Sequence, residues 1–198
     1  MMLTLYHLPI SQNSRRVWIT LIDKGLEFEL VEVQLSAEQF KPEFLAINPF
    51  HHIPALVDAG FNVIESLAIL DYLEVKYPTP VMLPKDAEDL AIVRMVEIVS
   101  VNELLPAITP LMSVILDLPG KNAEAIEQAK TKISTALNFF ENQLDDRPYF
   151  GNENLTLAEI VAGSIVLWVP RGGIYLDDYP TLKAWYDHLV ALPAQQTT

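Results

Sequence analysis

Hydrophobic and polar residues alternate over short stretches early in the chain, whereas later they recur at helical spacing. Four short stretches are apolar or alternating and rich in β-branched or aromatic residues, so each is predicted to be a strand: 3–6, 28–33, 55–58 and 61–64. Between them the pattern predicts helices over 14–24, 42–46 and 66–76. Because the first strand, helix and strand follow one another directly, a parallel pair with a right-handed crossover is expected.

After residue 77 every predicted element is a helix. One helix is expected over 87–116, although Pro106 and Pro110 should kink or break it. A turn at 118–121 leads to a helix that ends before 145–148, and a further helix is expected from Thr156 to about Val169. A last helix should follow Tyr179-Pro180-Thr181 and end near Leu192, before a short polar tail over 194–198. Three prolines within 77–86 indicate a linker. The predicted domains are therefore 1–77 and 87–198, joined by 78–86.

The helix near residue 157 has a well-defined start signal. Thr156 can accept a hydrogen bond from the backbone of Glu159, while the Glu159 side chain can reach back to the Thr156 N–H. Leu155 and Ile160 can pack together beside this capping box. The residues that follow are almost all apolar, so this helix is expected to be buried.

Composition and charge narrow the functional classes. The 198 residues include no cysteine, which excludes disulfides, thiolate metal sites and a cysteine nucleophile, and agrees with a reducing cytoplasm. The net charge is −13, with acidic residues spread along the chain, so neither nucleic acid nor an anionic membrane is an expected partner. No signal peptide is expected at the start, and the uncharged run 104–116 is too short to span a bilayer.

Two neighbouring segments suggest a binding site for a peptide-like anion. Pro54 stands where a strand should begin; a cis bond to Ile53 would turn the main chain of Ile53 toward a ligand. Glu65 and Ser66 stand where a helix should begin, and the unpaired N–H groups of a helix start bind anions. A carboxylate-bearing small molecule is the expected ligand.

Four segments together resemble the soluble glutathione transferase family over essentially the whole chain. They are the first-loop segment Ser11-Gln12-Asn13-Ser14-Arg15-Arg16-Val17, the cis-proline segment from Asn48 to Leu56, the segment Glu65-Ser66-Leu67-Ala68-Ile69, and the Thr156 capping box. The chain looks closest to the theta, phi and bacterial serine types, and the chi class is a further candidate. It lacks the Ser-Ser-Cys signature of the zeta-type isomerases, and without cysteine it cannot be of the beta or omega type.

The resemblance implies an α/β thioredoxin-like N-terminal domain with a mixed four-stranded sheet, followed by an all-α domain. It further implies a cytoplasmic homodimer that conjugates the thiol of glutathione, its co-substrate, to a hydrophobic electrophile. Two alternatives stay open. One is a non-catalytic regulatory or binding protein of the same fold, and the other is a glutathione-dependent isomerase, dehalogenase or peroxidase.

The resemblance also implies which residues form the site. Ser11 is expected to stabilise the glutathione thiolate; Ser14, which is favoured as a helix cap, and Tyr6, which precedes the first loop, are weaker candidates. Arg15 and Arg16 could assist the thiolate or be solvated.

Six residues are expected to bind glutathione: Lys41, His52, Ile53, Pro54, Glu65 and Ser66. The main chain of Ile53 would pair with the cysteinyl backbone, Ser66 would hold the γ-glutamyl carboxylate and Glu65 its ammonium group. Lys41 and His52 would hold the glycyl carboxylate. The pair His51-His52 departs from the family pattern of glycine followed by lysine or glutamine, and it is a weak metal signal, so no metal is expected.

The electrophile pocket is expected to be apolar and open. The implied lining residues are Ile10, Leu111, Met112 and Ile115, although a core position explains any of them equally well. The segment Arg171-Gly172-Gly173 has no account at this stage.

Overall fold

The computed structural model describes residues 2–34, 38–116 and 122–197, which divide into two compact units. The first comprises residues 2–81 together with α9 (Pro193–Thr197), and the second comprises Met82–Leu192. The expected turn at 118–121 lies outside the described residues. The expected domain 87–198 included the polar tail 194–198, whereas residues 193–197 form a short helix in the first unit.

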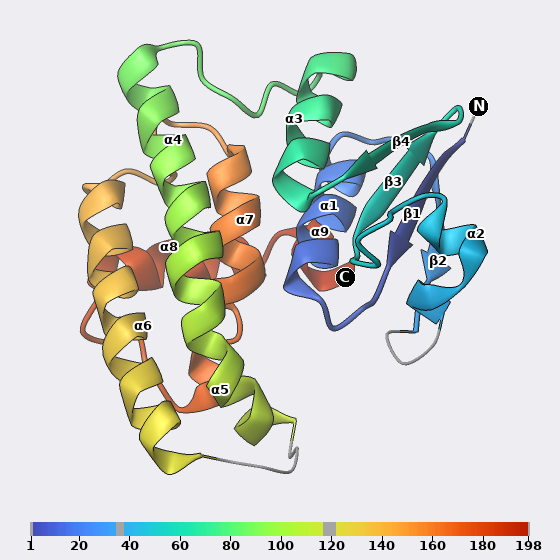
Figure 1. Cartoon of the computed structure of the whole chain (residues 1–198). Coiled ribbons are helices and arrows are strands. Elements are labelled where there is room, and N and C mark those ends of the chain that lie inside the picture. Colours follow the sequence, from blue (N-terminus) through green and yellow to red (C-terminus); the bar gives the residue numbers. More distant parts are fainter. Residues whose placement is uncertain (1, 35–37, 117–121, 198) are drawn as a thin grey trace. The chain divides into compact units, whose positions relative to one another are not determined.

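The first unit is a mixed four-stranded sheet with helices beside it (Figure 1). Its elements are β1 (Leu3–His7), α1 (Gln12–Asp23), β2 (Phe28–Glu32), the 3₁₀ turn η1 (Glu38–Phe40), α2 (Pro42–Leu45), β3 (Ala55–Asp58), β4 (Phe61–Ile64) and α3 (Ser66–Lys76). The strand order is β2-β1-β3-β4; β1 and β2 are parallel, and the other two pairs are antiparallel. The sheet expected from the sequence is confirmed.

Helices α1 and α3 pack together on one face of this sheet, and α2 lies on the other (Figure 1). Leu5, Val17, Leu56 and Leu70 are fully buried in the layer between the sheet and the two helices. On the opposite face, Phe44 of α2 packs with Val33 and Ala55. Burial on both faces fixes the register of the strands, because a slip of one residue would exchange their two faces.

The fully buried Lys24 joins α1 to the end of α3. Its ammonium donates to Glu74 Oε2 at 2.7 Å, to the Tyr77 carbonyl at 2.8 Å and to the Pro80 carbonyl at 3.0 Å. The last carbonyls of a helix lack intrahelical partners, and a cation at that end also interacts favourably with the helix dipole. Lys24 therefore fixes where α3 ends and where the chain leaves the sheet.

The second unit is a bundle of helices around the buried helix α7 (Leu157–Val166) (Figure 1). The other elements are α4 (Ala87–Val99), the π-helical turn η2 (Ser100–Leu104), α5 (Leu105–Ile115), α6 (Ala123–Leu144), the 3₁₀ turn η3 (Pro170–Gly172) and α8 (Pro180–Val190). Every residue of α7 is buried, as its apolar sequence predicts. The expected capping box is confirmed, with the Thr156 N–H donating to Glu159 Oε2 at 2.7 Å.

The prolines were expected to kink or break this helix, and no break is found, because the helical run Ala87–Ile115 continues through both of them. Proline at position 106 cannot donate to the carbonyl of residue 102, and the π-helical turn η2 lies at this point, where the Leu105 N–H donates five residues back to Ser100. By length and composition alone this run could cross a membrane, but Val93, Val96, Leu104 and Ile108 pack in the core of the second unit.

The structure explains Arg171-Gly172-Gly173 as a packing feature. A Cβ atom added to Gly172 would lie 2.9 Å from Cδ1 of the buried Leu111, so only glycine lets η3 approach α5 this closely. Gly173 has φ +79°, a left-handed value that favours glycine. The Arg171 guanidinium lies 4.6 Å from the centre of the Trp168 ring, a cation–π contact.

Candidate functional site

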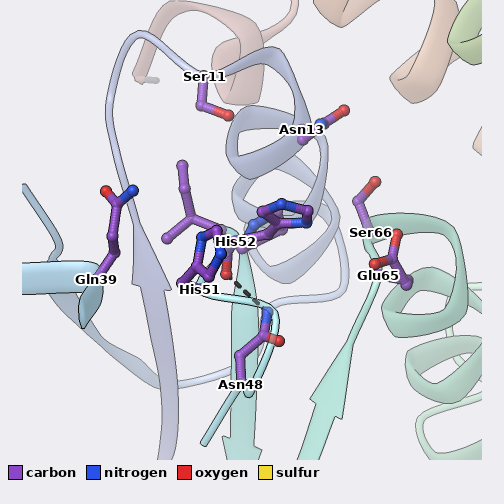
Figure 2. Close-up of a pocket in the computed structure, with 10 residues that line it drawn as sticks. Ser11, Asn13, Gln39, Asn48, His51, His52, Glu65 and Ser66 are labelled. Atoms are coloured by element: carbon purple, nitrogen blue, oxygen red, sulfur yellow. Dashed lines mark hydrogen bonds between the residues drawn. The ribbon is translucent and has the colours of Figure 1, made fainter. Parts of the chain in front are cut away.

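A cavity of about 420 Å³ lies in the first unit, at the ends of α1 and α3 (Figure 2). Three separate parts of the sequence contribute most of its lining: the start of α1, the loop before β3 and the start of α3. The lining residues are Ser11, Asn13, Gln39, Asn48, His51, His52, Ile53, Pro54, Glu65 and Ser66. A volume of this size suits a small ligand.

Ser11 is the N-cap of α1, and its side chain lines the cavity. Its Oγ accepts a hydrogen bond from the Ser14 N–H at 3.3 Å, which leaves the hydroxyl proton available for donation to a ligand. The helix begins at Gln12 rather than at Ser14, so the expectation that Ser14 caps it is wrong. Ser11 combines a capping role with a place at the cavity.

Neither of the other two hydroxyl candidates lines this cavity. Ser14 is 1% exposed, and its Oγ accepts from the Leu8 N–H at 3.3 Å. The ring of Tyr6 packs on Phe44 with 5.9 Å between centroids, on the α2 side of the sheet. Among the lining residues, Ser11 and Ser66 are the two hydroxyl-bearing side chains.

The loop before β3 is held by Asn48, a buried residue that was not expected to contribute. Its Nδ2 donates to the His52 carbonyl at 2.7 Å, and its Oδ1 accepts from the Phe50 N–H at 3.0 Å. The Ile53–Pro54 peptide bond is cis, and Pro54 is buried directly before β3. An asparagine before proline is a common turn signal, so its role could have been read from the sequence.

The start of α3 lies at one end of the cavity and has the features of an anion-binding site. Glu65 is the N-cap residue with φ +66°, a conformation unusual for a side-chain-bearing residue, and its carboxylate makes no capping hydrogen bond. Ser66 is the first helical residue and is buried. The first N–H groups of a helix have no intrahelical acceptor and carry a partial positive charge.

Arg16 adds a permanent positive charge behind Ser66. Its Nη1 donates to Ser66 Oγ at 3.5 Å, and the side chain is fully buried. From the sequence, Arg16 could either assist the thiolate or be exposed to solvent. Its burial excludes exposure to solvent. Its contact with Ser66 joins residues 50 positions apart, which no local pattern predicts.

Lys41 does not line the cavity. It is the N-cap residue of α2, its side chain is 58% exposed, and its Nζ lies 3.3 Å from Glu38 Oε1. Gln39, on the 3₁₀ turn η1, lines the cavity instead. The sequence-based expectation for Lys41 therefore lacks support in the geometry, and Gln39 was missed because the turn could not be foreseen.

The residues expected to line an electrophile pocket lie in both units. Ile10, next to Ser11, is 54% exposed. Leu111 is 1% exposed and belongs to the core of the second unit, whereas Met112 and Ile115 are partly buried and pack against that core. Leu111 therefore has the core position that the sequence left open as its alternative.

Within the described residues no group of three or more His, Asp or Glu side chains could hold a metal ion. A second cavity, of about 790 Å³, is lined by residues of the helical unit, among them Arg147 and Trp185. The Arg147 guanidinium already donates to the carbonyls of Gln143, Leu144 and Gly151. The start of α8 at this second cavity is already capped, because Glu141 accepts from the N–H groups of Thr181 and Leu182. The start of α3 has no side-chain cap, so the first cavity is the better candidate.

The chain matches two family models, which together cover most of its length. The model described as glutathione S-transferase, N-terminal domain, matches residues 5–81, and the model described as glutathione S-transferase, C-terminal domain, matches residues 89–193.

Similar proteins include two enzymes and one solved structure. Glutathione S-transferase F10 of Arabidopsis thaliana is 34% identical, over 96% of this chain and 92% of its own length. Maleylacetoacetate isomerase of Mus musculus is 31% identical, over 98% and 90%. The structure of glutathione S-transferase-I bound with lactoylglutathione has a TM-score of 0.88 and 28% identity, and the similarity covers 100% of this chain and 98% of that one.

Proposed function

Because this chain belongs to the glutathione S-transferase family, we propose that its first unit binds glutathione and that the enzyme conjugates glutathione, through its sulfur, to hydrophobic electrophiles. The thiolate sulfur forms a bond to an electrophilic carbon of the acceptor. In a substitution the leaving group departs with the bonding electron pair; in an addition the acceptor takes up a proton. The enzyme must therefore supply a thiolate at neutral pH.

Ser11 is the residue that we assign to thiolate stabilisation. An ordinary thiol has a pKa of about 8.5, so only a small fraction is ionised at pH 7. Lowering this pKa by about 2 units requires roughly 2.7 kcal/mol. A charge-assisted hydrogen bond from the Ser11 hydroxyl, together with the positive end of α1, can contribute that much.

The remaining groups of the cavity match the rest of glutathione. The γ-glutamyl carboxylate would bind the Ser66 hydroxyl and the first N–H groups of α3, with Arg16 behind them. The ammonium group would pair with Glu65, which makes no capping hydrogen bond. The main chain of Ile53 would pair with the cysteinyl backbone, and the glycyl end would lie toward His52.

One observation carries the proposal: Ser11, Ile53 and Glu65-Ser66 come from three distant segments, yet all line one cavity. A hydroxyl for the sulfur, a main-chain segment for the peptide and a helix start for the carboxylate are the parts that glutathione activation requires. A purely structural role for each segment would not require that they meet.

The test compares wild type with Ser11→Ala and Ser11→Thr. Calorimetric titration measures glutathione binding, and turnover is measured with a panel of hydrophobic electrophiles such as chloronitrobenzenes. Ser11→Ala should keep glutathione binding but lower kcat/KM about 100-fold, the equivalent of about 2.7 kcal/mol. Ser11→Thr keeps both the hydroxyl and the cap, so it should retain most activity.

The two parts of the proposal fail separately. If wild type does not bind glutathione, the function is wrong. If glutathione binds and Ser11→Ala turns over electrophiles at the wild-type rate, only the assignment of Ser11 is wrong.

A second candidate function is glutathione-dependent isomerisation, because the 31% identical relative is named maleylacetoacetate isomerase. An isomerase needs the sulfur to add to a double bond and leave again after rotation, so the same thiolate site would serve. Against this, the chain has no cysteine and lacks the zeta-type signature. Assaying maleylacetoacetate beside the electrophile panel separates the two activities.

We further propose that the protein is a cytoplasmic homodimer. Met95 and Ile98 are exposed apolar residues three positions apart on α4, and Phe61 and Val75 are exposed on the first unit. Exposed apolar side chains of this size favour burial against a second copy. Sedimentation at micromolar concentration should give twice the chain mass; a monomer would contradict the assembly but not the activity.

A further inference from the structure

The second cavity, in the helical unit, plays no part in the proposed activation of glutathione. Its volume of about 790 Å³ lies in the range of ligand-binding cavities. The lining comes from the segment that follows α6 and from α8, which packs against α6. The lining residues are Asp146, Arg147, Pro148, Tyr149, Glu153, Pro180, Thr181, Ala184, Trp185 and His188. The chemistry of these side chains decides which kind of ligand the cavity suits.

The charge that this cavity presents to solvent is negative. Asp146 and Glu153 are exposed lining residues. The guanidinium of Arg147 donates to three backbone carbonyls and lies 3.9 Å from a carboxylate oxygen of Asp89. Glu141 accepts from two of the first N–H groups of α8. At neutral pH an anion therefore finds neither an available cation nor a free helix start among the described lining residues, whereas a positively charged group is attracted by both exposed carboxylates.

Much of the remaining lining consists of cyclic side chains. Pro148 and Tyr149 follow α6, Pro180 begins α8, and His188 lies about two turns later on that helix. The Tyr149 hydroxyl and His188 Nε2 are 2.8 Å apart, with 5.6 Å between the ring centroids, so a hydrogen bond holds these two rings together. Proline rings of a ligand pack well on surfaces lined by aromatic side chains.

Trp185 adds a hydrogen-bond donor that the protein itself does not use. This residue is 3% exposed, and its Nε1 is buried without an acceptor among the described residues. An indole N–H can only donate, and a buried donor without a partner costs free energy. A side-chain adjustment of the kind common at interfaces would present this N–H to an acceptor oxygen of a ligand. The ligand should therefore combine an acceptor with positive charge and apolar surface.

We propose that this cavity binds a basic, proline-rich segment of a partner protein. Such a segment adopts an extended polyproline II helix, whose backbone carbonyls have no internal hydrogen-bond partner and can accept from the protein. Its proline rings pack against the cyclic side chains of the lining, and one of its carbonyls accepts from Trp185. Its arginine or lysine side chains pair with Asp146 and Glu153.

Other modes of peptide recognition fit this cavity less well. Strand addition needs an exposed sheet edge, and the described part of the helical unit contains helices and turns but no strand. A bound amphipathic helix uses its carbonyls within the helix and needs an apolar groove, whereas this lining includes two exposed carboxylates. The net charge of −13 adds a long-range attraction for a basic partner.

The probe is a peptide of three arginine-proline-proline repeats, blocked at both ends and titrated into the full chain by calorimetry. Two matched peptides carry glutamate in place of arginine or serine in place of proline, and spermidine serves as a cation of the same charge without carbonyls. The serine peptide should bind about threefold to tenfold more weakly than the probe, because it is not preorganised as a polyproline II helix. The glutamate peptide and spermidine should each bind more weakly by about tenfold or more.

The double variant Asp146→Asn/Glu153→Gln removes both charges of the cavity while it keeps the size of the side chains. Asparagine tolerates the left-handed backbone at position 146, where φ is +61°. The matched control Glu27→Gln/Glu29→Gln removes two exposed carboxylates of the first unit. The cavity variant should bind the probe about fivefold to tenfold more weakly than wild type, and the control should stay within about twofold of wild type.

The indole N–H signals report where the probe binds. The chain has three tryptophans, so Trp185→Phe assigns the signal of Trp185 in a ¹⁵N-resolved NMR spectrum. When the probe binds, the Trp185 N–H proton should shift downfield, because it forms a hydrogen bond to a peptide carbonyl. The signal of Trp18, in the first unit, should not change and serves as the internal control.

Several outcomes would overturn the proposal. If the probe does not bind, or if the glutamate peptide binds equally well, no basic segment is recognised. An unchanged Trp185 signal, or an unchanged affinity in Asp146→Asn/Glu153→Gln, would show that the probe binds elsewhere. Equal affinity for the serine peptide would exclude proline-rich recognition, and equal affinity for spermidine would identify a site for small organic cations instead. None of these results bears on glutathione binding in the first unit.

Discussion

Gly151 and Gly173 of the helical unit have nearly the same φ, +84° and +79°, but different surroundings. A Cβ atom at position 151 would lie 2.8 Å from the backbone carbonyl oxygen of Asp89, whereas position 173 has no heavy atom within 4 Å. Left-handed backbone in a residue with a Cβ costs roughly 1–2 kcal/mol. A substitution at Gly173 therefore tests backbone strain alone, whereas one at Gly151 tests strain and steric overlap together.

Gly173→Ala should lower the free energy of unfolding by about 1–2 kcal/mol, through strain alone. Gly151→Ala should cost about 3 kcal/mol or more, because a backbone carbonyl cannot move aside as a side chain can. Urea denaturation of both variants measures the difference. Equal losses would show that the contact between Gly151 and Asp89 relaxes freely.

At the level of single residues, the sequence predicted which residues lie together at the cavity where the signal was local. Ser11, Ile53-Pro54 and Glu65-Ser66 all line the cavity, because each lies at an element boundary marked by its neighbours. Arg16 was not predicted to support Ser66, since that contact depends on the packing of α1 against α3. Lys41 was assigned to the glycyl carboxylate because related classes have a basic residue at this place, but the 3₁₀ turn before it brings Gln39 to the cavity.

Two helices, α3 and α7, each depend on a buried ionisable side chain. The first of these side chains is Lys24. Lys24→Met removes the ammonium from Glu74 and from two carbonyls at the end of α3. Removing one partner of a buried ion pair typically costs about 3–5 kcal/mol, so the variant should unfold at clearly lower urea concentration. The control Lys41→Met removes an exposed ion pair of the same unit and should change the midpoint little. Similar midpoints for the two variants would contradict this role of Lys24.

The second buried ionisable side chain is Glu159, which takes part in the capping box of α7 in the helical unit. Burial raises the pKa of its carboxyl to about 7, against hydrogen bonds from Phe150 and Thr156 that lower it. The folded state therefore binds a proton that the unfolded state, with a glutamate pKa of about 4.3, has released. The stability that this group contributes is fully present below the unfolded-state pKa and is lost as pH rises through the folded-state pKa, that is, between about 4.3 and 7.

Glu159→Gln tests this sign. Its amide cannot accept from both the Phe150 and Thr156 donors, so the variant should be less stable, by about 2 kcal/mol or more at pH 5. The stability gap between wild type and variant should shrink by roughly 2 kcal/mol between pH 5 and pH 7.5. Denaturation at both pH values measures the gap, and a constant gap would show that Glu159 does not titrate in this range.

At the level of elements, the sequence predicted whether a segment is a helix or a strand better than it predicted where each element begins and ends. All four strands and the main helices follow from periodicity and turn residues, but α1 begins two residues earlier than expected because Ser11, not Ser14, caps it. Where a kink or break was expected at Pro106, the structure has a π-helical turn, and residues on either side of this turn pack in the core of the second unit. Residues 193–197 have no apolar periodicity; their helix is stabilised by packing on α1, where Arg15 donates to the Gln195 carbonyl at 2.8 Å.

For the whole molecule, the net charge of −13 should influence how quickly glutathione arrives. Like charges slow association, and salt screens them over a Debye length of about 10 Å at 0.1 M. Raising NaCl from 20 to 200 mM at pH 8 should increase the association rate of S-methylglutathione about twofold in stopped-flow experiments. An analogue whose glycyl carboxylate is replaced by an amide is less negative and should respond less. A rate that falls with salt would show that local positive charge near Arg16 outweighs the overall field.

The path of the chain between the two units has a consequence for its synthesis. The first unit consists of residues 2–81 and the helix 193–197, so the whole helical unit is made between its two parts. At about 5–20 residues per second, the ribosome needs roughly 5–20 s to add the intervening residues. Throughout that time the face of α1 that binds α9 is uncovered. The nascent chain should therefore contain a nearly complete sheet, with this face of α1 accessible to chaperones until α9 emerges from the exit tunnel.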